Sequence, residues 1–88
     1  MNTFFALMAE YGTAHIPVEK CSDLFGMSPK KACELAGRQG LPVPTFRIGS
    51  QKSPWLIDAV KLAAHLDLAK KNAAADWELL QKMPHQPR

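Results

Sequence analysis

The chain has few cysteines, and they lack the spacing of a metal or redox site. Its 88 residues include two, Cys21 and Cys33, which form no Cys-x-x-Cys pair. A zinc site that combines them with His15, His65 or His85 would match no known ligand spacing. We therefore expect no metal and no cofactor. We also expect both thiols to stay reduced inside helices, as is usual in the cytosol.

Long hydrophobic runs are also missing. No apolar stretch approaches the ~20 residues that a membrane-spanning helix needs. The opening MNTFFALMAEYG contains Glu10 and lacks the basic segment of a secretory signal. These features predict a cytoplasmic protein without a membrane partner.

The sequence contains no recognisable catalytic motif. It has no glycine-rich phosphate loop and no nucleophile motif. Its eight acidic residues are scattered singly, and neither His15 nor His65 has an obvious partner. We therefore expect this chain not to be an enzyme.

The pattern of apolar residues predicts one small domain, mainly α with a small β-hairpin. We interpret it as a winged helix-turn-helix with a long C-terminal helix. Residues 1–57 would form the DNA-binding core. Residues 58–88 would form the long helix, which packs on the core, together with a frayed tail.

The first half of the chain predicts three short helices. Thr3 is a candidate cap for a helix at 4–10, although Phe4, Phe5 and Tyr11 would also suit a strand. Residues 15–17 should be extended, because a residue before proline favours the β region. A second helix would span 17–25, and its buried face would consist of Val18, Cys21, Leu24 and Phe25.

Ser28 and Pro29 are a strong start signal for a third helix at 29–39, after a three-residue turn. Its buried stripe would be Ala32, Leu35 and Ala36. Two prolines limit residues 44–48 to an edge strand, which would pair across a polar tip with a strand at 55–57. Thr45 and Arg47 would face the same side of that strand. Asp58 would then cap a helix running to about Lys82.

The charge distribution points to a polyanionic partner. The net charge is +3, yet residues 28–54 hold five basic residues and one acid, Glu34. A basic surface confined to one segment favours nucleic acid, although a solvated face would give the same count.

Two segments would contact double-stranded DNA. In a helix-turn-helix, the start of the second helix meets base edges in the major groove. Here those residues would be Ser28, Lys30, Lys31 and Glu34, while Arg38 would meet phosphate. The wing at 47–54 would lie on the backbone or in the minor groove through Arg47, Ser50, Gln51, Lys52 and Ser53. An αα-hairpin and a plain polar hairpin are the structural alternatives.

The apolar stripe of the long helix extends beyond the reach of the core. Its core-facing members would be Ala59, Leu62, Ala63, Leu66 and Ala69, and its extension would be Ala73, Trp77, Leu80 and the next candidate, Met83. The expected dimer interface consists of Leu66, Ala69, Ala73, Trp77 and Leu80. Such a stripe is typical of an interface, and we expect a two-fold homodimer. Alternatively, the helix could fold back to cover Phe4, Phe5 and Tyr11.

The opening TFFALMAEYG, the segment HIPVEKCSDLFGMSPKKACELAGRQGLPVPTFRI, the SQKS wing and DAVKLAAHLD together resemble the pyocin activator family of PrtN-like proteins. The resemblance covers about residues 2 to 70. It implies a transcriptional activator of bacteriocin and phage-derived genes that acts on promoter-upstream DNA. The organisation is also similar to the MerR and excisionase winged helix-turn-helix group.

The resulting hypothesis is a dimeric, sequence-specific DNA-binding regulator associated with the nucleoid. Its other candidate partner is RNA polymerase. One alternative is an excisionase-type architectural protein that bends DNA for recombination. Another is a phage protein that inhibits a host complex through the surface around Trp77.

Overall fold

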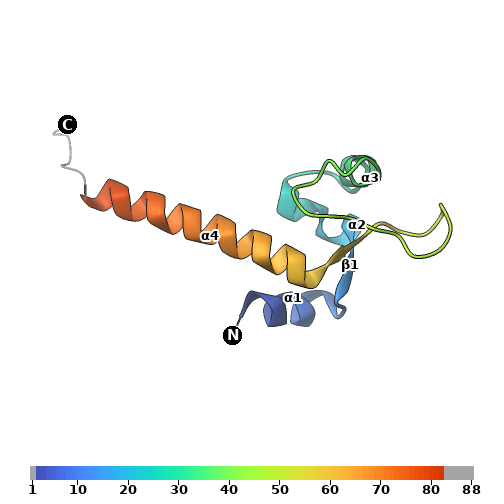
Figure 1. Cartoon of the computed structure of the whole chain (residues 1–88), viewed down its shortest axis with the longest axis horizontal. Coiled ribbons are helices and arrows are strands. Elements are labelled where there is room, and N and C mark those ends of the chain that lie inside the picture. Colours follow the sequence, from blue (N-terminus) through green and yellow to red (C-terminus); the bar gives the residue numbers. More distant parts are fainter. Residues whose placement is uncertain (1, 83–88) are drawn as a thin grey trace.

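The computed structural model describes residues 2–82 and shows a small helical unit at one end of a long helix (Figure 1). The order is α1 (Thr3–Tyr11), β1 (His15–Pro17), α2 (Val18–Cys21), the 3-10 helix η1 (Ser22–Phe25), α3 (Pro29–Gly37), β2 (Leu56–Asp58) and α4 (Ala59–Lys82). Helices account for 62% of the described residues, so the prediction of a mainly helical fold with a small two-stranded element and a long last helix is confirmed.

The first segment is a helix, not a strand, but its cap differs from the expected one. The Asn2 side chain accepts a hydrogen bond from the Phe5 backbone N–H at 2.9 Å and so caps α1. Thr3, the expected cap, instead donates its hydroxyl to the carboxylate of Asp67 on α4. Gly12 ends the helix with φ 71°, a left-handed conformation that glycine adopts without strain.

The two-stranded sheet differs from the expected wing hairpin. Strand β2 pairs antiparallel with β1, with Ile16 opposite Ile57, and both side chains are fully buried. The incoming wing segment contributes only an isolated bridge from Phe46 to Leu56, with N–O distances of 3.0 and 2.8 Å. Prolines at 44 and 54 lack the N–H groups that a longer ladder would need. The extended 15–17 segment was predicted, but its pairing was not.

The core draws on every helix except η1, as well as on both strands. Its buried apolar side chains are Leu7, Ile16, Val18, Cys21, Ala32, Ala36, Leu41, Val43, Ile57, Ala59, Leu62 and Ala63. The expectation that Leu24 belongs to this core is wrong, since 43% of its surface is exposed. After Cys21 the chain tightens into the 3-10 turn of η1, which changes the direction of the following side chains.

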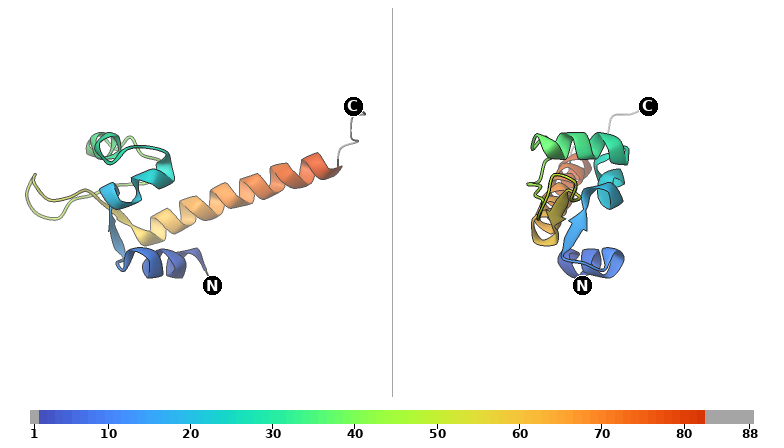
Figure 2. Two further views of the ribbon diagram at one scale, coloured as in Figure 1. Left: turned by 180° about the vertical axis from the view of Figure 1, so that it is seen from behind. Right: turned by 90° about the vertical axis from the view of Figure 1, so that its right-hand side faces the viewer.

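Helix α4 begins as predicted, because Asp58 accepts a hydrogen bond from the Val60 N–H at 2.9 Å. Only its first part packs on the core, where Ala59, Leu62 and Ala63 are buried and α1 lies alongside. Residues 67–82 are all exposed, and the helix projects away from the rest of the molecule (Figures 1 and 2). The expected frayed tail, together with Met83 and His85, lies outside the described residues.

Candidate nucleic-acid interface

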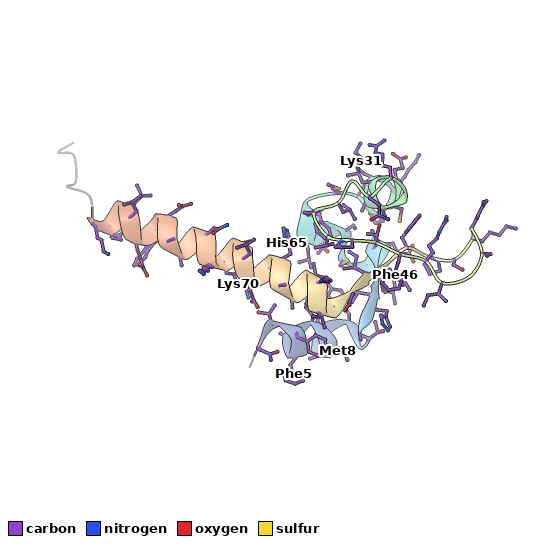
Figure 3. The ribbon with its side chains drawn as sticks, in the orientation of Figure 1. Phe5, Met8, Lys31, Phe46, His65 and Lys70 are labelled. Atoms are coloured by element: carbon purple, nitrogen blue, oxygen red, sulfur yellow. The ribbon has the colours of Figure 1, made fainter. Side chains whose placement is uncertain are left out.

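The start of α3 is built as the sequence predicted. The Ser28 hydroxyl oxygen accepts a hydrogen bond from the Lys31 N–H at 3.2 Å, and Pro29 occupies the first helical turn. Ala32 and Ala36 are buried on the inner face, which packs against α2. The opposite face is therefore exposed and carries Lys30, Lys31, Glu34 and, just past the helix end, Arg38. Figure 3 shows Lys31 pointing away from the molecule.

The turn before α3 is also present. Gly26 adopts φ 70° and donates its N–H to the carbonyl of Asp23 at 3.0 Å, and the Met27 N–H donates to Ser22 at 3.3 Å. These bonds end η1 and direct the chain into α3. The first helix of the predicted pair is therefore a composite of one α-helical turn and one 3-10 turn. The second is a regular helix that presents its basic face outward.

A clamp that sequence reasoning missed connects the end of α3 to the wing. The Gln39 side chain bonds to both backbone groups of Thr45, accepting from its N–H at 3.1 Å and donating to its carbonyl at 2.9 Å. Thr45 is buried, and its hydroxyl donates to the carbonyl of Ala36 at 2.9 Å. Thr45 was expected on the same side of the strand as Arg47, but this bond turns it into the core. Gln39 adopts φ 55°, which costs a non-glycine residue about 1 kcal/mol.

The wing places its polar side chains in solvent. Ser50, Gln51 and Lys52 are exposed, and Ser53 is half-buried. Internal bonds shape the tip: the Lys52 N–H donates to the Ser50 hydroxyl oxygen at 3.2 Å, and the Ser53 N–H donates to the Ser50 carbonyl at 3.0 Å. The wing and α3 lie together at the end of the molecule remote from the C-terminal end of α4 (Figures 1 and 2).

Arg47 occupies a different environment from the other wing residues. Its guanidinium lies 4.2 Å from the centre of the Trp55 ring, and Nη1 donates to the Gln51 carbonyl at 2.7 Å. Gln51 lies in the wing and Trp55 directly follows it, so Arg47 braces the loop through contacts with its own segment. Sequence reasoning also missed Ile48 next to it, which is an apolar side chain with 69% of its surface exposed.

The residues of the expected dimer interface on α4 are mostly exposed. Leu66 is half-buried against the core, whereas Ala69, Ala73, Trp77 and Leu80 are exposed. The alternative, in which the helix covers α1, holds only for the first part of α4, which packs against α1. The distal part does not fold back, because α4 continues unbroken to Lys82 and 62% of the Trp77 surface is exposed. Two further exposed leucines, Leu68 and Leu79, were not anticipated.

The two thiols lie in apolar surroundings. Burial, with a smaller contribution from the Asp23 charge, raises the pKa of the Cys21 thiol to about 11. Burial also raises the pKa of Cys33, assisted by Glu19. Within residues 2–82, no three side chains among histidine, cysteine, aspartate and glutamate gather as a metal site. In the same part of the chain, every helix is too short or too polar to cross a membrane.

Comparison with known proteins gives one family. The sequence model of one protein family, described as pyocin activator protein PrtN, matches residues 3–73. The matched residues include α1, α3, the wing and the first part of the exposed segment of α4, and they end before Trp77. No match was found among curated proteins or among solved structures.

Proposed function

The chain belongs to the pyocin activator family, and from this premise we propose that it is a sequence-specific double-stranded DNA-binding regulator of bacteriocin and phage-derived genes. The family name indicates a regulatory role for pyocin genes. The observation that carries the DNA-binding part is the joint placement of the basic face of α3 and the polar wing, which the Gln39–Thr45 clamp connects.

Helix α3 would enter the major groove with its N-terminal end. Lys30 and Lys31 could donate to guanine O6 and N7, and Glu34 could accept from cytosine N4. The hydroxyl of Ser28 and the N–H of Lys30 would meet phosphate, a common partner of helix N-termini. Arg38, at the far end of the helix, would meet phosphate on the other side of the groove.

The wing would contact the backbone or the minor groove through Lys52, Gln51, Ser50 and Ser53. We propose that Arg47 acts differently from the sequence expectation. Because its guanidinium already stacks on Trp55 and bonds to Gln51, it would position the wing, while Lys52 would supply the charge.

The protein would act by binding and not by catalysis. We propose that it works in the cytoplasm, on the nucleoid, as a homodimer that covers a two-fold or repeated site. Activation of transcription would then need contact with RNA polymerase.

Selection from random duplexes, followed by binding measurements over a range of salt concentrations, tests the proposal. With about two phosphate contacts per subunit, log affinity of a dimer should fall against log salt with a slope of about −3 to −4. The enriched sequences should share a motif. Failure to enrich any motif, together with an affinity that does not change between about 50 and about 200 mM salt, would contradict the proposal.

A second candidate function has one specific observation in its favour, the exposure of Trp77 and Leu80. If the chain instead inhibits a host protein complex through this surface, Lys31→Ala should leave its biological effect intact and Trp77→Ala should abolish it. A DNA-binding regulator should lose its effect with Lys31→Ala.

A further inference from the structure

The distal half of α4 carries a stripe of four side chains that no other part of residues 2–82 covers. We call Ala69, Ala73, Trp77 and Leu80 the distal stripe. They are spaced by three or four residues and therefore lie on one face of the helix, continuous with Leu62 and Leu66 of the core-facing side. Trp77 and Leu80 are 62% and 61% exposed. An apolar face of this kind favours a helical partner.

The order of side-chain sizes along the distal stripe distinguishes the possible arrangements of two copies. It runs small, small, large, large. In a parallel pair, alanine would face alanine and tryptophan would face tryptophan, so the helices would be held apart at Trp77 and leave a gap at Ala69 and Ala73. In an antiparallel pair, every layer would combine one small and one large side chain, which allows a constant helix separation.

The helix dipoles also favour the reversed arrangement, because antiparallel helices place the positive end of one dipole beside the negative end of the other. The charged side chains of the segment do not decide the orientation. Lys71 and Glu78 lie on the side of the helix opposite the distal stripe, and only Lys70 and Asp76 flank it. The dipole effect is small at an exposed site, so the order of side-chain sizes carries the argument.

We propose that two copies of this chain pair through the distal stripe in antiparallel orientation, with Trp77 packed against Ala73 of the partner subunit. Ala69 then lies opposite Leu80 of the partner subunit, and the two-fold axis passes near residue 75. The inference gives the proposed DNA-binding dimer its geometry, and in that respect it rests on the proposed function.

The shape of the molecule leaves room for this arrangement. The helical core lies at the N-terminal end of α4 (Figure 1). Beyond Asp67, which bonds to Thr3 of α1, the helix extends a further fifteen residues to Lys82, or about 22 Å. Two such segments side by side put the cores at opposite ends of the pair. Each α3 and its wing then remain uncovered by the other subunit.

Two neighbouring leucines provide a matched test of the surface. Leu79 and Leu80 are exposed to the same extent, 62% and 61%, but point about 100° apart because an α-helix has 3.6 residues per turn. Light scattering of the full chain without DNA, over a range of concentrations, should show that Leu80→Ala weakens dimerisation at least several-fold. Leu79→Ala should leave it unchanged. Equal weakening by both, or a wild-type chain that is monomeric throughout, would overturn the proposal.

Cysteine cross-linking in a Cys33→Ser background tests the orientation. An equimolar mixture of Ala69→Cys and Leu80→Cys proteins should form a disulfide-linked heterodimer on mild oxidation, because residues 69 and 80 face each other in the antiparallel pair. Each variant alone should cross-link poorly, since its two cysteines would be about 16 Å apart, against the ~7 Å limit for Cα atoms in a disulfide. Efficient cross-linking of each variant with itself would show parallel pairing and overturn the proposal. Neither measurement uses DNA, so its failure would leave the DNA-binding proposal to be judged separately.

Discussion

The Arg47 guanidinium stacks on the Trp55 ring at 4.2 Å from its centre and holds the Gln51 carbonyl at 2.7 Å. One basic side chain thus connects the start of the wing to Gln51 at its tip and to Trp55 just after its end. A flexible loop would lose conformational freedom on binding DNA, and a loop braced in this way loses less. If the protein binds DNA as proposed, Arg47 would contribute by holding the shape of the wing, whereas Lys52 at the tip would contribute its charge.

This pairing predicts that Arg47→Lys, which keeps the charge, will weaken DNA binding. Lysine has no planar group to stack on Trp55, and its ammonium cannot contact the ring and the Gln51 carbonyl in the same geometry. Loss of a stacking contact of about 0.5–1 kcal/mol corresponds to a roughly two- to five-fold weaker affinity. Trp55→Leu should have a similar effect, and the double variant should lose less than the sum of the two. The salt dependence should stay close to that of the wild type, and a slope clearly flattened by Arg47→Lys would show that Arg47 contacts phosphate directly.

Replacing Lys52 and replacing Lys31 should weaken DNA binding in different ways. Replacing Lys52 with alanine should weaken binding to all sequences alike and reduce the salt slope by about one per subunit. Replacing Lys31 should cost about 1–3 kcal/mol at the preferred sequence and relax the preference at one base pair. Lys82→Ala, at the opposite end of α4, is the control and should change neither. The measurement is a binding isotherm on selected and scrambled duplexes, and a sequence-independent loss with Lys31→Ala would place that residue on the backbone.

Local sequence signals explain which elements could be predicted. Ser28 and Asp58 cap helices through their side chains as expected, and Gly26 ends η1 through its left-handed backbone conformation. The long helix follows from the absence of proline and glycine after Asp58. These features depend on neighbours within a few residues, and the pattern of one segment is enough to reveal them.

The remaining features depend on contacts that no local pattern encodes. The pairing of Ile16 with Ile57 joins strands about forty residues apart, and the bonds from Gln39 to Thr45 require the two segments to be packed already. Likewise, the sequence predicts Arg47 as a DNA contact, and only the structure shows that its guanidinium stacks on Trp55. The basic face of α3 could be found from the sequence, whereas the parts that hold the wing in place required the fold.

The clamp between Gln39 and Thr45 predicts that removing the Thr45 hydroxyl will destabilise the fold. Thr45→Val keeps the shape of the side chain but removes the hydroxyl that donates to the buried Ala36 carbonyl at 2.9 Å. The free energy of unfolding should fall by about 1 kcal/mol, the net contribution of one hydrogen bond, because the Ala36 carbonyl keeps its bond from the Gln39 N–H at 3.1 Å. Thr13→Val is the control, because its hydroxyl makes only exposed bonds and its loss should cost no more than about 0.5 kcal/mol. Equal effects in urea denaturation would mean that the Thr45 hydroxyl does not stabilise the fold.

The buried thiol of Cys21 predicts a loss of stability in alkaline solution. Its pKa rises from 9.0 to about 11 on folding, so the folded protein holds the proton more tightly than the unfolded chain. The stabilisation is complete below about pH 9 and is lost as the pH rises through about 11, where the folded state ionises too. A shift of this size corresponds to roughly 2–3 kcal/mol.

The measurement must compare the wild type with Cys21→Ala at each pH, because burial also raises the pKa of Tyr11, which therefore contributes to the pH dependence of stability in alkaline solution. The difference in unfolding free energy between wild type and Cys21→Ala should shrink between pH 9 and 11 by that amount. A difference that stays constant over this range would show that the Cys21 thiol ionises as easily in the folded protein as in the unfolded chain.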